Sequence, residues 1–274
     1  MKQIAVLLTV FNRKEKTLLC LRNLHQQTLP NECQMDIYLT NDGCTDGTPE
    51  AIKKQYPQVH IINAQGNLYW NRGMHLAWQT AAKTKDYNYY LWINDDTFIY
   101  EKAIENLLSS AAIHEEKAII TGACEDTQTH SHITYGGRKN WQIVIPNGKE
   151  TEVDCINGNI VLIPQYVFHI LGNLDYYFTH SKGDFDYGMR AVKAGIKMYQ
   201  VGVPLGACDV HEKLDKWCNP EVPFIQRWKM LHQPNGMPPK ETFHLEHRHF
   251  GFFTALKHFF SIYLRVCYPK LWIK

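Results

Sequence analysis

Several features that would place this sequence outside the cytoplasm are missing from it. Its eight cysteines, at positions 20, 33, 44, 124, 155, 208, 218 and 267, include no Cys-x-x-Cys pair, which argues against a zinc knuckle and a disulfide framework. The apolar run at positions 4–8 is far too short for a signal peptide or a membrane span. Nowhere else does the sequence contain an uninterrupted apolar stretch long enough to span a membrane. We therefore expect a cytoplasmic protein with reduced thiols.

A strong net charge is also lacking. The 29 basic side chains almost balance 27 acidic ones, giving a formal net charge of +2, so no global field marks the protein as a binder of nucleic acid. There is no internal repeat and no low-complexity segment. A chain of 274 residues is long enough for one large α/β domain or two small ones, each with a sizeable core.

The first half of the sequence alternates short apolar runs with amphipathic ones, which predicts parallel strands joined by crossover helices. The expected strands are 3–9, 35–40, 59–63, 89–93 and 118–121. The expected helices are 14–27, 48–56, 72–84 and 101–112. From about residue 122, segments rich in Gly, Asn, Thr and His predict antiparallel ribbons and loops, with helices at 164–171 and 185–194, the second ended by Gly195.

Polar residues follow the first two expected strands, at 9–13 and 41–48. A carboxylate such as Asp42 can accept a hydrogen bond from the imide N–H of a uracil or thymine ring, and Gly43 and Gly47 permit close backbone approach. The alternative is ordinary turn chemistry, in which Asp46 or Thr48 caps the next helix. The motif alone does not decide between these interpretations.

Two further acidic motifs suit catalysis. Asn94, Asp95 and Asp96 directly follow the fourth strand, and the two acidic residues form an oxygen-rich site suited to Mg²⁺ or Mn²⁺ bridging a diphosphate. A solvated turn or a helix cap would look the same. Asp184 lies at the expected start of a helix, where a carboxylate can act as a general base or merely cap the helix. Asp186 and Arg190 are four residues apart and can pair to support that turn.

Taken in order, the segments 9–13, 41–48, 66–73 and 94–97 resemble inverting glycosyltransferases of family 2, which have the GT-A fold. The resemblance covers roughly residues 3–212. It implies an α/β fold with a Rossmann-like, mostly parallel sheet flanked by helices, and a nucleoside diphosphate sugar as donor. The residues that it assigns to the donor are Thr9, Phe11, Asn12, Arg13, Asp42, Asn67, Trp70, Arg72, Asn94 and Asp95.

The resemblance also assigns the metal and the base. The outer positions of the family's Asp-x-Asp motif fall on Asn94 and Asp96, so Asp96, together with His211, is the expected ligand of Mg²⁺ or Mn²⁺. The family's Glu-Asp-x-Asp motif falls on residues 183–186, which makes Asp184 the base for an inverting displacement. Gly183 replaces the usual Glu, a departure that affects acceptor contacts.

We expect the chain to divide into a GT-A domain at 1–222, with a nucleotide-binding half at 1–121 and an acceptor-binding half at 122–222, and a basic, aromatic helical extension at 223–274. On a helix, five side chains of the extension fall on one stripe: Phe252, Leu256, Phe259, Phe260 and Tyr263. Such a helix is typical of contact with an anionic membrane, where a lipid-linked acceptor would be found. The alternatives are packing on the domain or a homodimer contact.

The expected function is sugar transfer to a glycan or lipid-linked acceptor in bacterial surface polysaccharide synthesis. One rival is a sugar-nucleotide nucleotidyltransferase, which is disfavoured because no glycine-rich phosphate loop follows the first strand. The other is a catalytically inactive carbohydrate-binding protein of the same fold, which the retention of Asp96 and Asp184 disfavours. The histidines at 244, 247 and 249 lack the cysteine partners of a structural zinc site.

Overall fold

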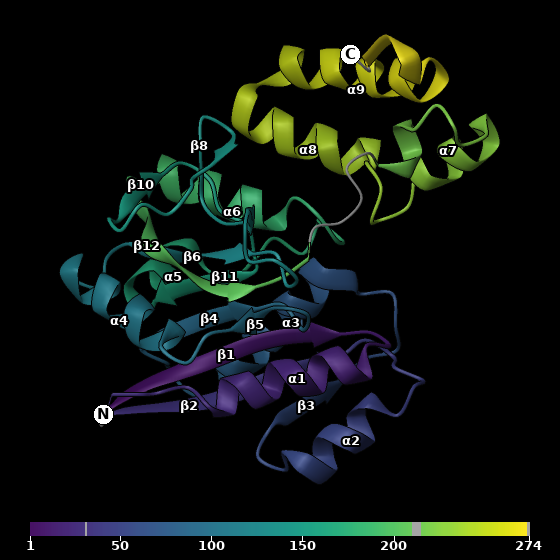
Figure 1. Ribbon diagram of the computed structural model, residues 1–274. Coiled ribbons are helices and arrows are strands. Elements are labelled where there is room, and N and C mark those ends of the chain that lie inside the picture. The colour runs from purple at the N-terminus through teal and green to yellow at the C-terminus, as the bar shows by residue number, and fades with distance from the viewer. Residues whose placement is uncertain (31, 210–214, 273–274) are drawn as a thin grey trace.

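A central sheet organises the chain, as the ribbon of the computed structural model shows (Figure 1). The structure describes residues 1–30, 32–209 and 215–272. Four parallel strands form one half of the sheet in the order β3-β2-β1-β4. They are β1 (Lys2–Val10), β2 (Cys33–Asn41), β3 (His60–Asn63) and β4 (Tyr89–Ile93), joined by α1 (Lys14–His25), α2 (Thr48–Gln55) and α3 (Tyr69–Thr84). The predicted alternation of strand and helix is confirmed.

The other half of the sheet is mixed. Strand β11 (Ile160–Pro164) lies between β4 and β6 (Ile119–Glu125) and is antiparallel to both, whereas β12 (Met198–Ala207) runs parallel to β6. The antiparallel pairing predicted beyond residue 122 is therefore confirmed. The shorter strands are β5 (Phe98–Ile99), β7 (Ile133–Tyr135), β8 (Arg138–Lys139), β9 (Gln142–Ile143) and β10 (Thr151–Val153).

Helices on both faces bury the central strands. Alternate side chains of β1 enter different cores: Ile4 and its neighbours on the same face pack with α1, while Ala5 and its neighbours pack with α3. All five residues of β4 are buried, as expected for a strand covered on both faces. Polar side chains can therefore reach solvent only where these strands end, which places a site at the edge of the sheet.

Three further helices shape the rest of the domain. They are α4 (Ala103–Ile113), α5 (Gln165–Leu171) and α6 (Gly183–Lys193). Asp184 and Asp186 lie in the first turn of α6, so the predicted placement of Asp184 at a helix start is confirmed. Gly195 follows this helix with a φ of 74°, the left-handed conformation that favours glycine after a helix.

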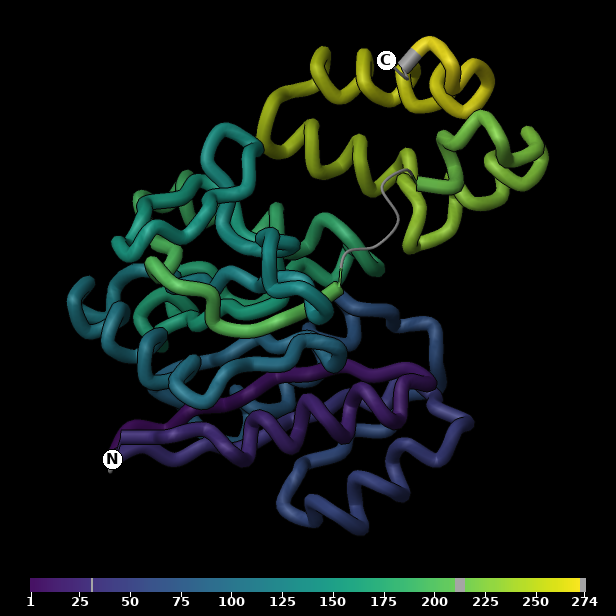
Figure 2. The backbone as a smooth tube through the Cα atoms, in the orientation of Figure 1, coloured from purple at the N-terminus to yellow at the C-terminus, as the bar shows by residue number. Residues whose placement is uncertain are grey.

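The C-terminal helices form a separate layer at one end of the molecule, with α8 nearer than α9 to the sheet domain (Figures 1 and 2). The elements are η1 (Lys216–Cys218), α7 (Phe224–Leu231), α8 (Pro239–Phe250), α9 (Phe252–Cys267) and η2 (Pro269–Trp272). Among the described residues, no helix has the length and apolar composition needed to cross a membrane.

The aromatic stripe predicted for the tail divides between two environments. Phe259 packs edge-on against Phe243 of α8, with ring centroids 6.0 Å apart, whereas Phe260 is 59% exposed. Packing on another part of the chain, one of the alternatives left open for this helix, therefore holds for part of the stripe. Part of the stripe forms the α8–α9 interface, and the remainder faces solvent.

Candidate functional site

Three predicted motifs meet at the edge of the sheet where β1, β2 and β4 end. The turn 94–97 follows β4, and the N–H of Asn94 donates to the carbonyl of Asn159, just before β11 begins. Because β11 is antiparallel to β4, its first residues lie at this same edge. The structure thus brings the acidic turn beside residues 157–159, which no sequence motif had singled out.

Arg13 holds the acidic turn. Its Nη1 lies 2.7 Å from Asp96 Oδ2 and 3.4 Å from Asp95 Oδ1, while Thr17 of α1 donates to the other oxygen of Asp95. Burial raises the pKa of Asp95 to about 7, although the Arg13 guanidinium acts in the opposite direction. The turn leads into β5 and not into a helix, so the interpretation of this pair as a helix cap is wrong.

The acidic turn offers one carboxylate that a metal ion could contact. Asn94 Oδ1 accepts a hydrogen bond from Trp70 Nε1 at 2.6 Å, and Asp95 is bonded inward, which leaves Asp96 as the carboxylate best placed for a metal. Mg²⁺ in such sites uses one or two carboxylates and completes its coordination with phosphate oxygens and water. Within the described ranges, no group of three or more His, Cys, Asp or Glu side chains is arranged so that it could hold a metal ion by itself. His211 lies outside the described residues.

Asp184 reaches the same edge from α6. Its Oδ2 accepts a hydrogen bond from the N–H of Gly158 at 3.1 Å, and its Oδ1 accepts one from the N–H of Phe185. The second contact lies within the first turn of α6, whose N-cap residue is Lys182 and carries no side-chain capping bond. The first ties the carboxylate to the loop before β11. Burial raises the pKa of Asp184, whereas these N–H groups lower it.

A single indole connects the two acidic groups. Trp70 Nε1 donates to Asn94, and the same ring lies over Gly158, where an ideal Cβ would be only 2.2 Å from Trp70 Cζ2. Since Gly158 donates to Asp184, Trp70 lies between the acidic turn and this carboxylate. The predicted stacking role of Trp70 remains untested, but its position as a wall of the site is clear.

A close neighbour makes glycine necessary at position 183. An ideal Cβ there would lie 1.7 Å from Asn71 Oδ1. The Asn71 amide is fixed because its Nδ2 donates to the carbonyls of Asp175 and Phe178. Asn71 of α3 thus fills the space of a side chain at 183. Asn71 lies in segment 66–73, one of the segments that carry the resemblance, but no role was assigned to it, and no sequence pattern assigned a role to Gly158. Each matters through a contact with a distant part of the chain.

The predicted base-binding residues line the neighbouring part of the edge. Asn12 and Thr45 hydrogen-bond each other, and Phe11 is 56% exposed. Thr9 packs against Gly73, where an added Cβ would meet its hydroxyl. Asp42 is buried, and both of its oxygens accept from the N–H groups that precede and begin α3, those of Leu68 and Tyr69.

The structure also places three further residues of the predicted motifs, and two of them have partners for their side chains. Asp46 accepts from the N–H groups of Lys14 and Thr48, the first residues of α1 and α2, although the N-cap residues of these helices are Arg13 and Gly47. Arg72 donates to the carbonyls of Tyr176 and Tyr177 and lies over the Tyr176 ring, and Asn67 is exposed with a φ of 65°. The nucleotide contacts predicted for Arg72 and Asn67 remain untested.

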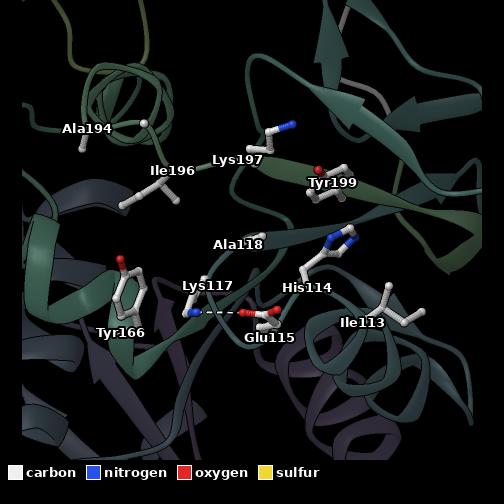
Figure 3. A pocket seen from close by; sticks show the side chains of 11 residues that line it. Ile113, His114, Glu115, Lys117, Ala118, Tyr166, Ala194, Ile196, Lys197 and Tyr199 are labelled. Atoms are coloured by element: carbon white, nitrogen blue, oxygen red, sulfur yellow. Dashed lines mark hydrogen bonds and ion pairs between the residues drawn. The ribbon is translucent and has the colours of Figure 1, made fainter.

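A cavity of about 460 Å³ lies elsewhere, between the end of α4 and the start of β12 (Figure 3). His114 stacks on Tyr199 there, and Lys117 pairs with Glu115. None of the candidate site residues lines this cavity. It is therefore separate from the edge at which the acidic groups meet.

Comparison with known proteins decides the family. The model of the family described as "Glycosyl transferase family 2" matches residues 5–171, more than half of the chain. The chain belongs to glycosyl transferase family 2. The acidic turn and Trp70 lie inside the matched segment, whereas Asp184 lies beyond it. No curated protein matches the chain in sequence.

Solved structures show that this family 2 chain has the GT-A fold. Residues 1–349 of S. aureus TarS in complex with UDP align with a TM-score of 0.57 at 13% identity, covering 77% of this chain and 61% of TarS 1–349. GalNAc-T7 with UDP, GalNAc and Mn²⁺ aligns with a TM-score of 0.57 at 11% identity, covering 74% of this chain and 42% of that one. The chain thus spans less than two thirds of either structure.

Proposed function

We propose that this family 2 chain transfers a sugar from a nucleoside diphosphate sugar to a hydroxyl of a glycan or lipid-linked acceptor, with inversion at the anomeric carbon. The observation that carries the proposal is the Trp70 indole, which touches both the acidic turn and the loop that binds Asp184. A donor diphosphate at the turn and an acceptor hydroxyl at Asp184 would then lie close enough for a single displacement.

The donor would lie along the edge between Phe11 and Trp70. UDP is bound in the TarS and GalNAc-T7 structures, which supports a nucleoside diphosphate as the ligand. Since both Asp42 oxygens already accept backbone N–H groups, we propose that Asp42 shapes the base site by holding the chain at Leu68 and Tyr69. Asn12 and Thr9 would line the same site.

Asp96 would hold Mg²⁺ or Mn²⁺ bound to the donor diphosphate, and Mn²⁺ is present in the GalNAc-T7 structure. When bound, this ion would neutralise charge on the departing diphosphate. Arg13, which is 2.7 Å from Asp96 in the structure, supplies a second positive charge at the same place. His211 would be a further ligand of this ion.

Asp184 would accept the proton of the acceptor hydroxyl. As that oxygen bonds to the anomeric carbon, the bond from this carbon to the diphosphate oxygen breaks on the opposite face, and the anomer is inverted. The raised pKa of Asp184 makes it a better proton acceptor than an ordinary aspartate. Because burial is the cause of that shift, exclusion of water from the site would strengthen it.

The exposed apolar side chains of α9 and of the residues after it would place the acceptor. Phe253 is 85% exposed, and Phe260 and Leu264 are also exposed on α9. Tyr268, which follows α9, and Leu271 of η2 are exposed as well. Residues 247–274 contain no Asp or Glu but five Lys or Arg. We propose that this face rests on the cytoplasmic side of an anionic membrane carrying the lipid-linked acceptor of a surface polysaccharide.

Vesicle binding tests this contact. Co-sedimentation with vesicles of mixed phosphatidylglycerol and phosphatidylcholine should fall for Phe253→Ser and Phe260→Ser, and should weaken with added salt. Ser131→Ala, which changes a side chain of the other domain, is the control. If the same substitutions instead convert a dimer to a monomer without affecting vesicle binding, this face is a homodimer contact.

The reaction is tested with a panel of nucleoside diphosphates and sugar nucleotides, each with and without Mn²⁺. Thermal stabilisation by a pyrimidine nucleotide, followed by release of nucleoside diphosphate when acceptor is added, is the expected result. Asp184→Asn should abolish transfer and retain donor binding. Release of pyrophosphate from a nucleoside triphosphate would indicate a nucleotidyltransferase, and binding without turnover would indicate an inactive protein.

A further inference from the structure

Asp186 joins the helix that carries Asp184 to the C-terminal extension. It is fully buried two residues beyond Asp184. Its Oδ2 accepts from Arg190 Nε at 2.9 Å, within the same helix, as the sequence predicted. Its Oδ1 accepts from Arg248 Nη1 at 2.8 Å and from His249 Nε2 at 2.9 Å, both on α8. A buried carboxylate needs such partners, because an unpaired buried charge is strongly destabilising.

Arg248 also reaches the segment that leads into α6. Its Nη2 donates to Asp175 Oδ2 at 2.6 Å, and the carbonyl of Asp175 is held by Asn71 of α3. One planar guanidinium thus bridges two carboxylates, one on each side of Asp184 in the sequence, a geometry that lysine cannot reproduce.

Other contacts fix α8 against the same segment. At its first turn Glu241 accepts from Thr179 Oγ1 at 2.7 Å, and near its end the carbonyl of Arg248 accepts from Lys193 Nζ. Midway, His244 stacks on Tyr177 with ring centroids 4.0 Å apart. The helix is therefore attached along its length to residues 175–193, which surround Asp184.

The start of α6 needs such support. Lys182, at the N-cap, has a φ of 77° and no side-chain capping bond precedes the helix. A left-handed conformation at a residue other than glycine costs free energy and persists only where its surroundings hold it. The Asp184 carboxylate depends on this turn for its direction.

We propose that Arg248 and His249 are positioning residues for sugar transfer, which fix the first turn of α6 through Asp186 and Asp175 and so aim Asp184 at the acceptor. The inference rests on the proposed function, since it takes Asp184 as the base. Both residues lie beyond the segment that the family model matches, so they add to the site a contribution from this chain's own extension.

Steady-state kinetics of the full chain, with donor binding measured separately, test the inference. Arg248→Ala and His249→Leu should lower kcat by on the order of 10²-fold, the cost of misplacing a catalytic group by about 1 Å, while the donor Kd stays within about twofold because the acidic turn is untouched. His249→Gln, whose amide N–H can occupy the place of Nε2, should keep most of the activity.

Arg265→Ala is the matched control, because Arg265 belongs to the same extension but stacks on Trp217. Assays are run well below the lowest melting temperature of the set. If Arg248→Ala does not fold, the inference is tested by comparing kcat between His249→Gln and His249→Leu. Three outcomes would overturn this inference while leaving the proposed function intact. They are an unchanged kcat in the Arg248 and His249 variants, a loss of kcat in Arg265→Ala equal to theirs, and an equal loss of kcat in His249→Gln and His249→Leu. Absence of turnover in the unmodified chain overturns the proposed function as well.

Discussion

Gly183→Ala should destabilise the protein because Asn71 occupies the space that a side chain needs. An ideal Cβ at 183 would lie 1.7 Å from Asn71 Oδ1 and 2.5 Å from its Cγ. Asn71 could withdraw only by giving up two hydrogen bonds, worth about 1 kcal/mol each, and overpacking elsewhere costs about 1–3 kcal/mol. We expect the free energy of unfolding to fall by about 2–4 kcal/mol, which lowers Tm by on the order of 10 °C for a chain of this size.

Urea unfolding of a double-mutant cycle measures the effect. Asn71→Ala removes the clashing atoms, and Asn71 Oδ1 has no other partner in the described part of the chain, so Gly183→Ala should cost little in that background. The expected coupling is about 1–3 kcal/mol. Gly188→Ala in the same helix is the control, because its Cβ would have no neighbour closer than 3.5 Å. Additive single-mutant effects, or a neutral Gly183→Ala, would refute the reasoning.

Three further predictions concern the site. Gly158→Ala, whose Cβ would lie 2.2 Å from Trp70, should displace the indole and lower the transfer rate by on the order of 10²-fold; a rate equal to that of the unmodified chain would contradict this role of Trp70. Because burial raises the pKa of Asp184 above 3.8, kcat/KM should fall as pH drops through that raised pKa. The contribution of Asp184 to the stability of the folded state should decrease as pH rises through the same range. A Tm difference between Asp184→Asn and the unmodified chain that does not change with pH would contradict the raised pKa. Arg13→Met should lower the free energy of unfolding by about 1–3 kcal/mol in urea, because buried Asp95 loses its cation; an unchanged midpoint would show that the pair is not stabilising.

The sequence predicted elements well where local pattern decides them. The strand expected at 89–93 is β4, and the helix expected at 48–56 is α2 at Thr48–Gln55. The helix expected at 72–84 begins earlier, at Tyr69. Its first N–H groups are bound by Asp42, 26 and 27 residues away in sequence, and a cap from so far along the chain leaves no local signal.

The exposure of the tail could not be predicted for a related reason. Helical spacing places Phe259 and Phe260 on the same side of α9, but only Phe259 meets Phe243 of α8. Which half of an apolar stripe is covered depends on where the neighbouring helix lies, and the sequence of one helix does not contain that information.

The sequence by itself determined the alternation of strands and helices, and with it the meeting of the polar turns after β1, β2 and β4 at one edge of the sheet. Those properties follow from the periodicity of a few consecutive residues. Only the tertiary structure decided that Arg13 pairs with Asp96, 83 residues away, and that Arg248 binds Asp186 across 62 residues. Such contacts depend on how whole helices pack against the sheet, because atoms distant in sequence meet only after the core has formed.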